Sequence, residues 1–404
     1  MNEKDLDINL DDIPDDVLDI LSGAIEYLNT YGEAFIISNM MIHLNHFRVK
    51  ELKDIAKRFG LSKLSKYKKG ELMELVEPYL LDEKKLEKKL LVLSDLAYKA
   101  LTKRVYKEDS LTVFEVSALE DLANDGYLMI TADGDIAIPK EIVAVMKKIT
   151  KKKSFQEKRR KLAFMNALFG YADYIYGVID ENLMKIMFET RFKNTSDREF
   201  MSLYNELEHP LMVHQGKEFI STTVLDQDAY DIVKQTHESH VISLLSEEEI
   251  ADYMNYGFPY SKQCYKRFYD SLFLFFRVEP LDAADVCRHI FSAICIDQRM
   301  QNINDYISDY ITFDSKDDLK MFMDLFMEIS NETRHFMTNG NVPNKLVKNH
   351  LANGGVIPMP DDEDLQKALK EHIEDIRDMG FDLDEDGNIS LKHDDDDHTG
   401  GFYS

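Results

Sequence analysis

Apolar residues recur every three or four positions between residues 48 and 76, which is the spacing of one face of an amphipathic helix. The first such set comprises Val49, Leu52, Ile55, Ala56 and Phe59. Gly60 follows it and predicts the end of that helix, and a second apolar set starts at Leu72. The pattern therefore predicts two short helices joined by a connector over residues 61–68.

The next part of the chain, residues 82–150, combines helical spacing with a hairpin pattern. Residues 114–124 are expected to be helical, and short apolar segments at 127–131 and 135–138 are separated by turn-forming residues. A further helix is predicted to begin at Pro139, because proline is well tolerated at a helix start. Helices followed by a two-stranded hairpin predict a winged-helix-like unit.

In a winged-helix arrangement one helix can enter the major groove of DNA, and residues 114–124 are in that position. They include Glu115, Glu120 and Asp121 and contain no Lys or Arg. Because carboxylates repel phosphate, we expect this unit to serve structure or protein contact rather than groove reading.

From residue 162 to residue 351 the pattern is mostly helical, with aromatic and methionine residues interleaved. A dense set between Tyr265 and Phe276 is expected to be core packing rather than a cofactor site. Residues 211–214 and 218–222 predict a short pair of strands around a glycine.

These patterns together predict a mainly α, multidomain fold with a small helix–loop–helix module, a winged-helix-like α+β unit and a larger helical domain. The predicted ranges are 1–44 for an acidic segment and lead-in helix, 45–81 for the module, 82–150 for the winged-helix-like unit, 151–161 for a basic linker, 162–351 for the helical domain and 352–404 for an acidic, partly disordered tail.

Charge narrows the classes of partner. The 404 residues carry a net charge of −26, which argues against indiscriminate coating of nucleic acid or binding to an anionic membrane. The acidic start of the chain is unlike a signal peptide, and the longest apolar stretches are too short to cross a bilayer. The three cysteines have no CxxC spacing and predict reduced thiols. We therefore expect a soluble, cytoplasmic protein whose contacts with nucleic acid are local.

The segment from Arg48 to Lys69 is the first local exception to the acidic charge. It contains nine basic and two acidic residues, a net +7. Cations of this kind contact phosphate, and amides at the start of the second helix can add donors. The candidate nucleic-acid contacts are Lys57, Arg58, Lys63, Lys66, Lys68 and Lys69. The alternative is a solvated lysine face with no partner.

A second basic run extends from Lys147 to Lys161, with nine basic residues and one glutamate, a net +8. It is interpreted either as a charged linker or as a second phosphate-contacting strip that cooperates with the first. The candidate contacts in this run are Lys151, Lys152, Lys153, Arg159 and Arg160.

The segment LKDIAKRFGLSKLSKYKKGELMELV resembles the SAP and Rho termination factor N-terminal class of helix–loop–helix modules. The resemblance implies association with DNA or RNA through the basic loop and the start of the second helix. A later segment resembles uncharacterised bacterial proteins that join a Rho-type module to a helical body and often end in a SEC-C zinc tail. The residues that carry this second likeness are Asn331, Thr333, Arg334, Asn339, Gly340, Pro343, Asn344 and Leu346. Cys295 is the last cysteine, so we expect no zinc tail of this kind.

Searches for catalytic or metal-binding patterns give no assignment. His237 and His240 lie three residues apart but do not form HExxH, and Cys287 and His289 are too close along a helix to face each other. The residues from Asp382 onward match the first positions of a calcium-binding loop, but position twelve is His393 where the loop requires glutamate. Nucleotide-binding and nucleophile-elbow motifs are missing. We predict no catalytic residue, no metal and no cofactor.

Arg334 is left open between two roles. A turn-adjacent arginine can clamp a carboxylate or phosphate ligand, or it can satisfy exposed carbonyls at a helix end, and the second role is favoured.

The favoured function is non-catalytic regulation or adaptation at nucleic acid, with weak, salt-sensitive contact to DNA or RNA and a protein partner held by the helical domain. One alternative is an acidic protein-interaction protein, or an inhibitor that imitates nucleic acid in charge, that binds a protein partner. The other alternative is an enzyme whose site is assembled within the helical domain.

Overall fold

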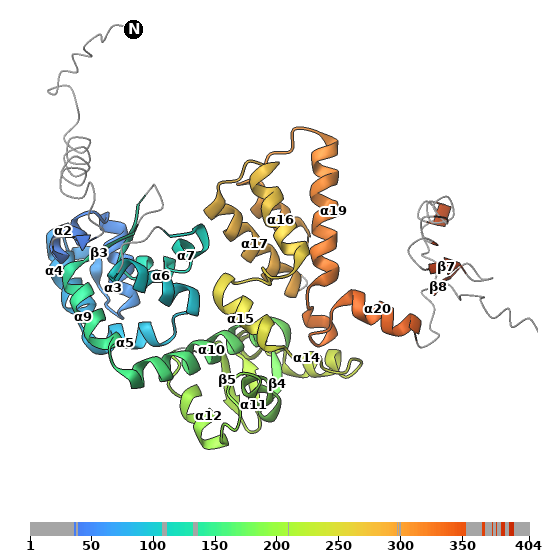
Figure 1. The fold of residues 1–404 in the computed structure, drawn as a ribbon, viewed down its shortest axis with the longest axis horizontal. Coiled ribbons are helices and arrows are strands. Elements are labelled where there is room, and N and C mark those ends of the chain that lie inside the picture. Colours follow the sequence, from blue (N-terminus) through green and yellow to red (C-terminus); the bar gives the residue numbers. More distant parts are fainter. Residues whose placement is uncertain are drawn as a thin grey trace, which may run out of the picture.

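The computed structural model describes residues 36–37, 39–106, 111–131, 136–208, 210–296, 298 and 300–352, with short stretches between 366 and 391. The predicted lead-in helix and most of the predicted acidic tail lie outside these residues. Within them the chain is mainly helical and carries small sheets (Figure 1). The predicted mainly α fold class is confirmed.

The N-terminal unit packs helices around a three-stranded sheet. Its helices are α2 (Met40–Asn45), α3 (Val49–Arg58), the 3-10 turn η2 (Leu64–Lys66), α4 (Lys69–Leu80), α5 (Glu83–Leu91), α6 (Asp95–Tyr106), α7 (Val113–Ser117), α8 (Glu120–Asn124) and α9 (Lys140–Thr150). Its sheet has the order β1 (Ile36–Ile37), β3 (Ile136–Pro139) and β2 (Met129–Ile130). β1 is parallel and β2 antiparallel to the central strand β3.

The predicted hairpin is confirmed, with Met129 opposite Ala137 and Ile130 opposite Ile136. The predicted single helix over residues 114–124 is wrong, because two short helices, α7 and α8, occupy that range. The chain turns between them at Ala118, and this turn places Leu119 in the core with no exposed surface.

The helical body begins with the long helix α10. Its elements are α10 (Lys153–Ile175), β4 (Val178–Asp180), α11 (Glu181–Glu189), α12 (Asp197–Tyr204), β5 (Met212–Gln215), β6 (Glu218–Ser221), α13 (Thr222–Asp226), α14 (Tyr230–His237), α15 (Glu247–Tyr256), α16 (Gln263–Leu274), α17 (Pro280–Cys295), α18 (Met300–Ile307), α19 (Lys316–Glu332), the 3-10 turn η3 (Phe336–Thr338) and α20 (Pro343–Ala352). β6 lies between β4 and β5 in an antiparallel sheet, which confirms the predicted pair of strands. Further along, β7 (Phe381–Leu383) pairs with β8 (Ile389–Leu391).

Helix α10 begins inside the segment predicted as a linker, so that prediction is wrong (Figure 1). Phe155 and Leu162 lie seven residues apart on one face of α10, and both are buried. Burial of two large apolar side chains stabilises the helix by about 3–6 kcal/mol before chain entropy is counted. The basic residues between these anchors are therefore carried by a packed helix.

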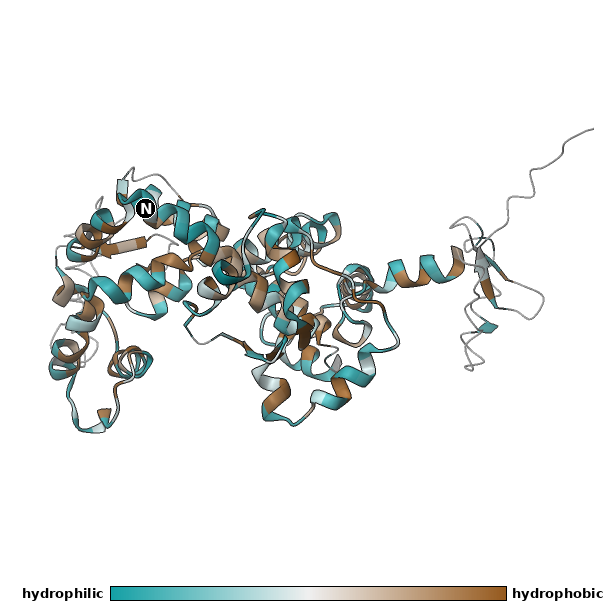
Figure 2. Ribbon diagram, turned by 90° about the horizontal axis from the view of Figure 1, so that it is seen from below, coloured by the Kyte–Doolittle hydropathy of each residue, from teal (hydrophilic) through white to brown (hydrophobic). Residues whose placement is uncertain are grey.

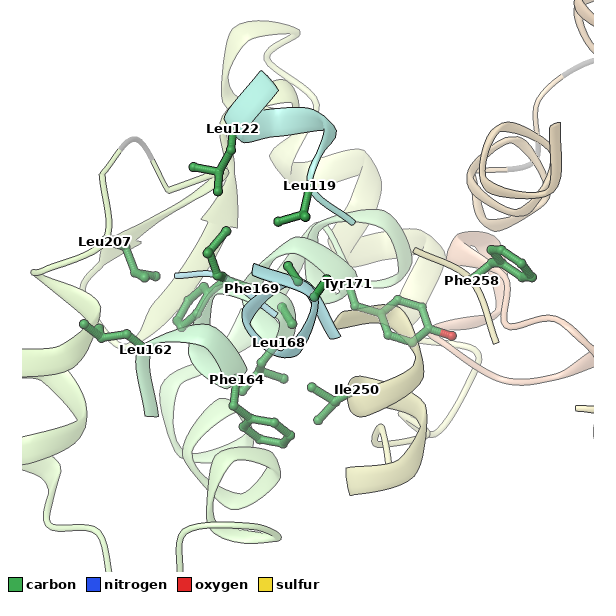
Figure 3. Close-up of a cluster of buried hydrophobic side chains, with 14 of the residues drawn as sticks. Leu119, Leu122, Leu162, Phe164, Leu168, Phe169, Tyr171, Leu207, Ile250 and Phe258 are labelled. Atoms are coloured by element: carbon green, nitrogen blue, oxygen red, sulfur yellow. The ribbon is translucent and has the colours of Figure 1, made fainter. Parts of the chain in front are cut away.

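One continuous hydrophobic cluster extends from Met40 in α2 to Ile329 in α19. Figure 3 shows side chains of this cluster from both parts of the chain: Leu119 and Leu122 come from the N-terminal unit, and Phe169, Tyr171 and Ile250 come from the helical body. The predicted domains thus share a core, and α10 contributes side chains to both parts of it.

Hydrophobic and hydrophilic residues alternate around the helices, as Figure 2 shows. In the part of the chain that the structure describes, no helix is both long enough and apolar enough to cross a bilayer.

Candidate nucleic-acid interface

The connector between α3 and α4 is held in place by a few backbone and apolar contacts. Gly60 has φ +79°, and the Leu61 amide donates to the Ala56 carbonyl at 3.0 Å, which closes the end of α3. The Leu64 side chain is buried beneath η2. Because Leu64 anchors the connector from below, its polar neighbours remain on the outer surface.

Three ammonium groups of the connector are exposed and lack an ion-pair partner among the described residues: Lys63, Lys66 and Lys68. Lys66 Nζ lies 4.9 Å from the centre of the Tyr67 ring, a contact that leaves its charge unneutralised. The fourth candidate, Lys69, donates from Nζ to the Asn45 carbonyl at 2.6 Å and so ties α4 to α2.

Lys63 has φ +57° and ψ +40°, in the left-handed region that L residues seldom adopt. A non-glycine residue there costs about 1–2 kcal/mol. The conformation turns the chain into η2 and puts a lysine at the position where glycine is the more stable choice.

The start of α4 contributes less than the sequence suggested. The Lys68 amide donates to Glu71 Oε2 at 2.7 Å, so the protein's own carboxylate occupies one donor at this end. Glu71 also places a negative charge beside the lysines. Phosphate contact at this surface therefore depends mainly on the ammonium groups.

Lys57 and Arg58, at the end of α3, each have a carboxylate partner. Lys57 Nζ lies 2.7 Å from Asp54 Oδ1 on the surface. Arg58 Nη1 lies 3.3 Å from Asp125 Oδ1, and Lys89 Nζ lies 2.8 Å from the other oxygen of that buried carboxylate. Arg58 thus connects α3 to the end of α8 and shares the single Asp125 carboxylate with Lys89.

The second basic run has most of its charge paired within the fold. Lys152 Nζ lies 3.8 Å from Glu83 Oε1, and Lys148 contacts the same carboxylate. Lys158 pairs with Glu206, and Lys161 pairs with Glu199. Of the predicted contacts, Lys151, Lys153 and Arg160 remain exposed without an ion-pair partner in the described part of the chain.

The prediction that Arg159 contacts nucleic acid is wrong, because its side chain is buried. Its Nη1 donates to the Leu93 carbonyl at 3.0 Å, its Nη2 donates to Asp95 Oδ1 at 2.8 Å, and its guanidinium lies over the Tyr98 ring. Burial favours a raised pKa for Asp95, but Arg159 and Arg191 outweigh burial and lower that pKa. Arg159 therefore fastens α10 to the start of α6.

The two histidines considered as metal ligands do not converge. His237 Nε2 donates to the Phe336 carbonyl at 2.9 Å, and burial lowers the pKa of this imidazole. His240 Nδ1 lies 2.8 Å from Ser239 Oγ. Among the described residues no group of three or more His, Cys, Asp or Glu side chains could hold a metal ion. The calcium-loop residues Asp384, Asp386, Gly387 and His393 lie outside the described residues.

Cys287 and His289 do not form a nucleophile–base pair. Cys287 is fully buried, and burial raises the pKa of its thiol. The His289 ring stacks on Tyr306, with 3.5 Å between ring centres. Two hollows of about 540 and 590 Å³ lie between the N-terminal unit and the helical body, and neither is lined by His237, His240 or Arg334.

Arg334 has the structural role. Its side chain is buried, and it donates from Nε and Nη2 to the two oxygens of Glu249 at 2.8 and 2.9 Å. Its Nη1 also donates to the carbonyls of Ser243 and Gly340. Burial favours a raised pKa for Glu249, but the Arg334 contact outweighs it and lowers that pKa to about 2. These bonds join three segments of the body and leave no donor directed at a ligand.

One surface was missed by the sequence patterns. Phe273 and Phe275 were expected in the core, yet they are 49% and 63% exposed at the end of α16, and Leu274 between them is 65% exposed. Consecutive helical residues point about 100° apart, so three in a row cannot all face one core. That spacing was the signal in the sequence.

Comparisons with family models, with curated proteins and with solved structures found no match for the chain.

Proposed function

We propose that the protein is a non-catalytic, nucleic-acid-associated regulator or adaptor that contacts the phosphate backbone through Lys63, Lys66 and Lys68. The observation that carries this proposal is their exposure without a carboxylate partner among the described residues, in a chain of net charge −26. A strongly acidic protein has many carboxylates with which to neutralise its lysines. These three stay unneutralised on one short connector.

The contact is weak and independent of sequence. A lysine ammonium on a flexible stem is a point charge, which attracts phosphate but does not read base edges. Each phosphate contact releases counterions, so three contacts to a duplex give a slope of about −3 in log affinity against log salt. The overall negative charge opposes approach at long range. Because added salt weakens the lysine–phosphate contacts themselves, binding is confined to low or moderate salt.

The test measures fluorescence anisotropy of the full chain with labelled single-stranded RNA, single-stranded DNA and duplex DNA across a salt series. The variant K63A/K66A/K68A should bind on the order of tenfold to a hundredfold more weakly at low salt and lose most of the salt slope. The polymer that binds most tightly identifies the partner.

The matched control is K151A/K153A/R160A, which removes the same three charges from exposed positions in the second basic run. Both variants change the long-range field equally, so a loss confined to the first variant locates the contact on the connector. Wild-type protein that binds none of the three polymers at low salt contradicts the proposal, as does equal binding by the wild type and K63A/K66A/K68A.

A further inference from the structure

Phe273, Leu274 and Phe275 form a protrusion of consecutive exposed hydrophobic residues at the end of α16, in the lobe that α16, α17 and α19 build (Figure 1). Leu319, near the start of α19, is 45% exposed. Phe276 packs edge-on against Phe313 and Phe322, which places the end of α16 beside the start of α19. Single exposed apolar residues are common, but a group of this kind marks an interaction surface.

A hollow of about 360 Å³ lies next to this protrusion, between α16 and α19. Ser271, one turn before Leu274 and Phe275, forms its edge on α16. Met321 and Leu325 supply apolar walls from α19, and both side chains are partly exposed. The hollow is broad and shallow, so leucine and phenylalanine side chains can lie against its apolar walls, and the same face carries both a protruding and a receiving feature.

Charges around the two features are complementary. Exposed Arg277, whose φ is +58°, lies two residues beyond Phe275. The hollow is bordered by exposed Asp317 and Asp324, with Lys320 between them on the same face of α19. None of Arg277, Asp317 and Asp324 has an ion-pair partner within the described residues. The protrusion therefore carries a free cation, and the hollow has two carboxylates to one ammonium.

We propose that this face joins two copies of the chain in an isologous dimer. If a two-fold axis passes between the protrusion and the hollow, each protrusion lies over the hollow of the partner copy, and both contacts form at once. Leu274 and Phe275 enter the hollow formed by α16 and α19 of the other copy, and Arg277 pairs with Asp317 and Asp324 there. This inference does not depend on nucleic-acid binding, because the connector that carries Lys63 is on another unit.

The test is sedimentation velocity of the full chain over a concentration series. Wild type should show a concentration-dependent shift from monomer to dimer, and L274E/F275E should weaken dimerisation by on the order of tenfold or more. The matched control V241E adds a carboxylate at an apolar residue that is 89% exposed elsewhere in the body, and it should dimerise like wild type. Far-UV circular dichroism checks that each variant is folded.

A charge exchange supplies an independent readout. R277E alone and D324R alone should each weaken the dimer, whereas R277E/D324R should recover affinity, because the two-fold axis restores the opposite-charge contact in both halves. A wild-type chain that stays monomeric throughout the concentration series overturns the proposal. A dimer that L274E/F275E leaves unchanged overturns it equally, because the two copies would then meet at another face.

Discussion

The runs Arg48–Lys69 and Lys147–Lys161 each hold nine basic residues, but the fold uses them differently. In the second run Lys148 and Lys152 share Glu83, and Arg159 is buried against Asp95. Of the predicted contacts, each run still leaves three exposed cations without a carboxylate partner in the described residues: Lys63, Lys66 and Lys68 gather on one short connector, whereas Lys151, Lys153 and Arg160 are spread over ten residues around the start of α10. The comparison teaches that the count of charges along a segment does not predict function, because function depends on which charges the fold leaves unpaired.

The largest expected effect is a difference in stability between substitutions at two neighbours in the second run, Arg159 and Arg160. R159A removes a buried guanidinium and leaves the Leu93 carbonyl without its donor, so the free energy of unfolding should fall by about 2–4 kcal/mol. R160A, at the adjacent exposed position, should change it by less than about 0.5 kcal/mol. Urea denaturation followed by circular dichroism measures both. Equal stabilities for the two variants would contradict the structural role of Arg159.

The next effect is the pH dependence of stability that the buried His43 causes. His43 in α2 is fully buried and donates from Nε2 to the Gly126 carbonyl at 2.8 Å. Burial lowers the pKa of His43 from 6.5 to about 4, even though the Gly126 contact opposes this. Between these values the unfolded chain binds more protons than the folded one, so stability falls as pH decreases from about 6.5 to about 4.

For His43 that loss reaches about 3 kcal/mol at the acidic end of the window. H43Q retains a donor for Gly126 and cannot titrate, so its free energy of unfolding should depend less on pH between 4 and 6.5. Glu249, with a pKa of about 2, loses its contribution only below about pH 4.5 and does not confuse the comparison. Urea denaturation at several pH values gives the slope, and identical slopes for wild type and H43Q would contradict the assignment.

The smallest expected effect comes from Lys63, where stability and nucleic-acid affinity should change in opposite directions. K63G relieves the left-handed conformation of Lys63 and should raise the free energy of unfolding by about 1 kcal/mol. It also removes one of the three unpaired ammonium groups, so nucleic-acid affinity should fall although the protein becomes more stable. K63A should lose similar affinity without the gain in stability. If K63G binds nucleic acid as wild type does, Lys63 is not part of the contact.

The sequence predicted helices and strands better than it predicted which charged side chains are paired within the fold. The amphipathic set from Val49 to Phe59 and the hairpin around residues 129–138 were visible because helices and strands have characteristic periods. The burial of Arg159 was not visible, because it depends on Leu93 and Asp95, more than sixty residues earlier in the chain. The free or paired state of each lysine likewise depends on carboxylates brought close only by folding. The three lysines of the connector were identified from local charge alone, since their neighbours include few acids.

The shared core has a consequence for how the protein is made. Phe114 of α7 packs against Tyr256 and Tyr260, and the Leu96 amide donates to Asn255, which lies 159 residues later. A ribosome that releases residues in order exposes Phe114 long before Tyr256 and Tyr260 exist to cover it. Contacts of such long sequence separation slow folding, because a large loop must close before they form. The nascent N-terminal unit therefore presents Phe114 uncovered until residues near 260 have emerged.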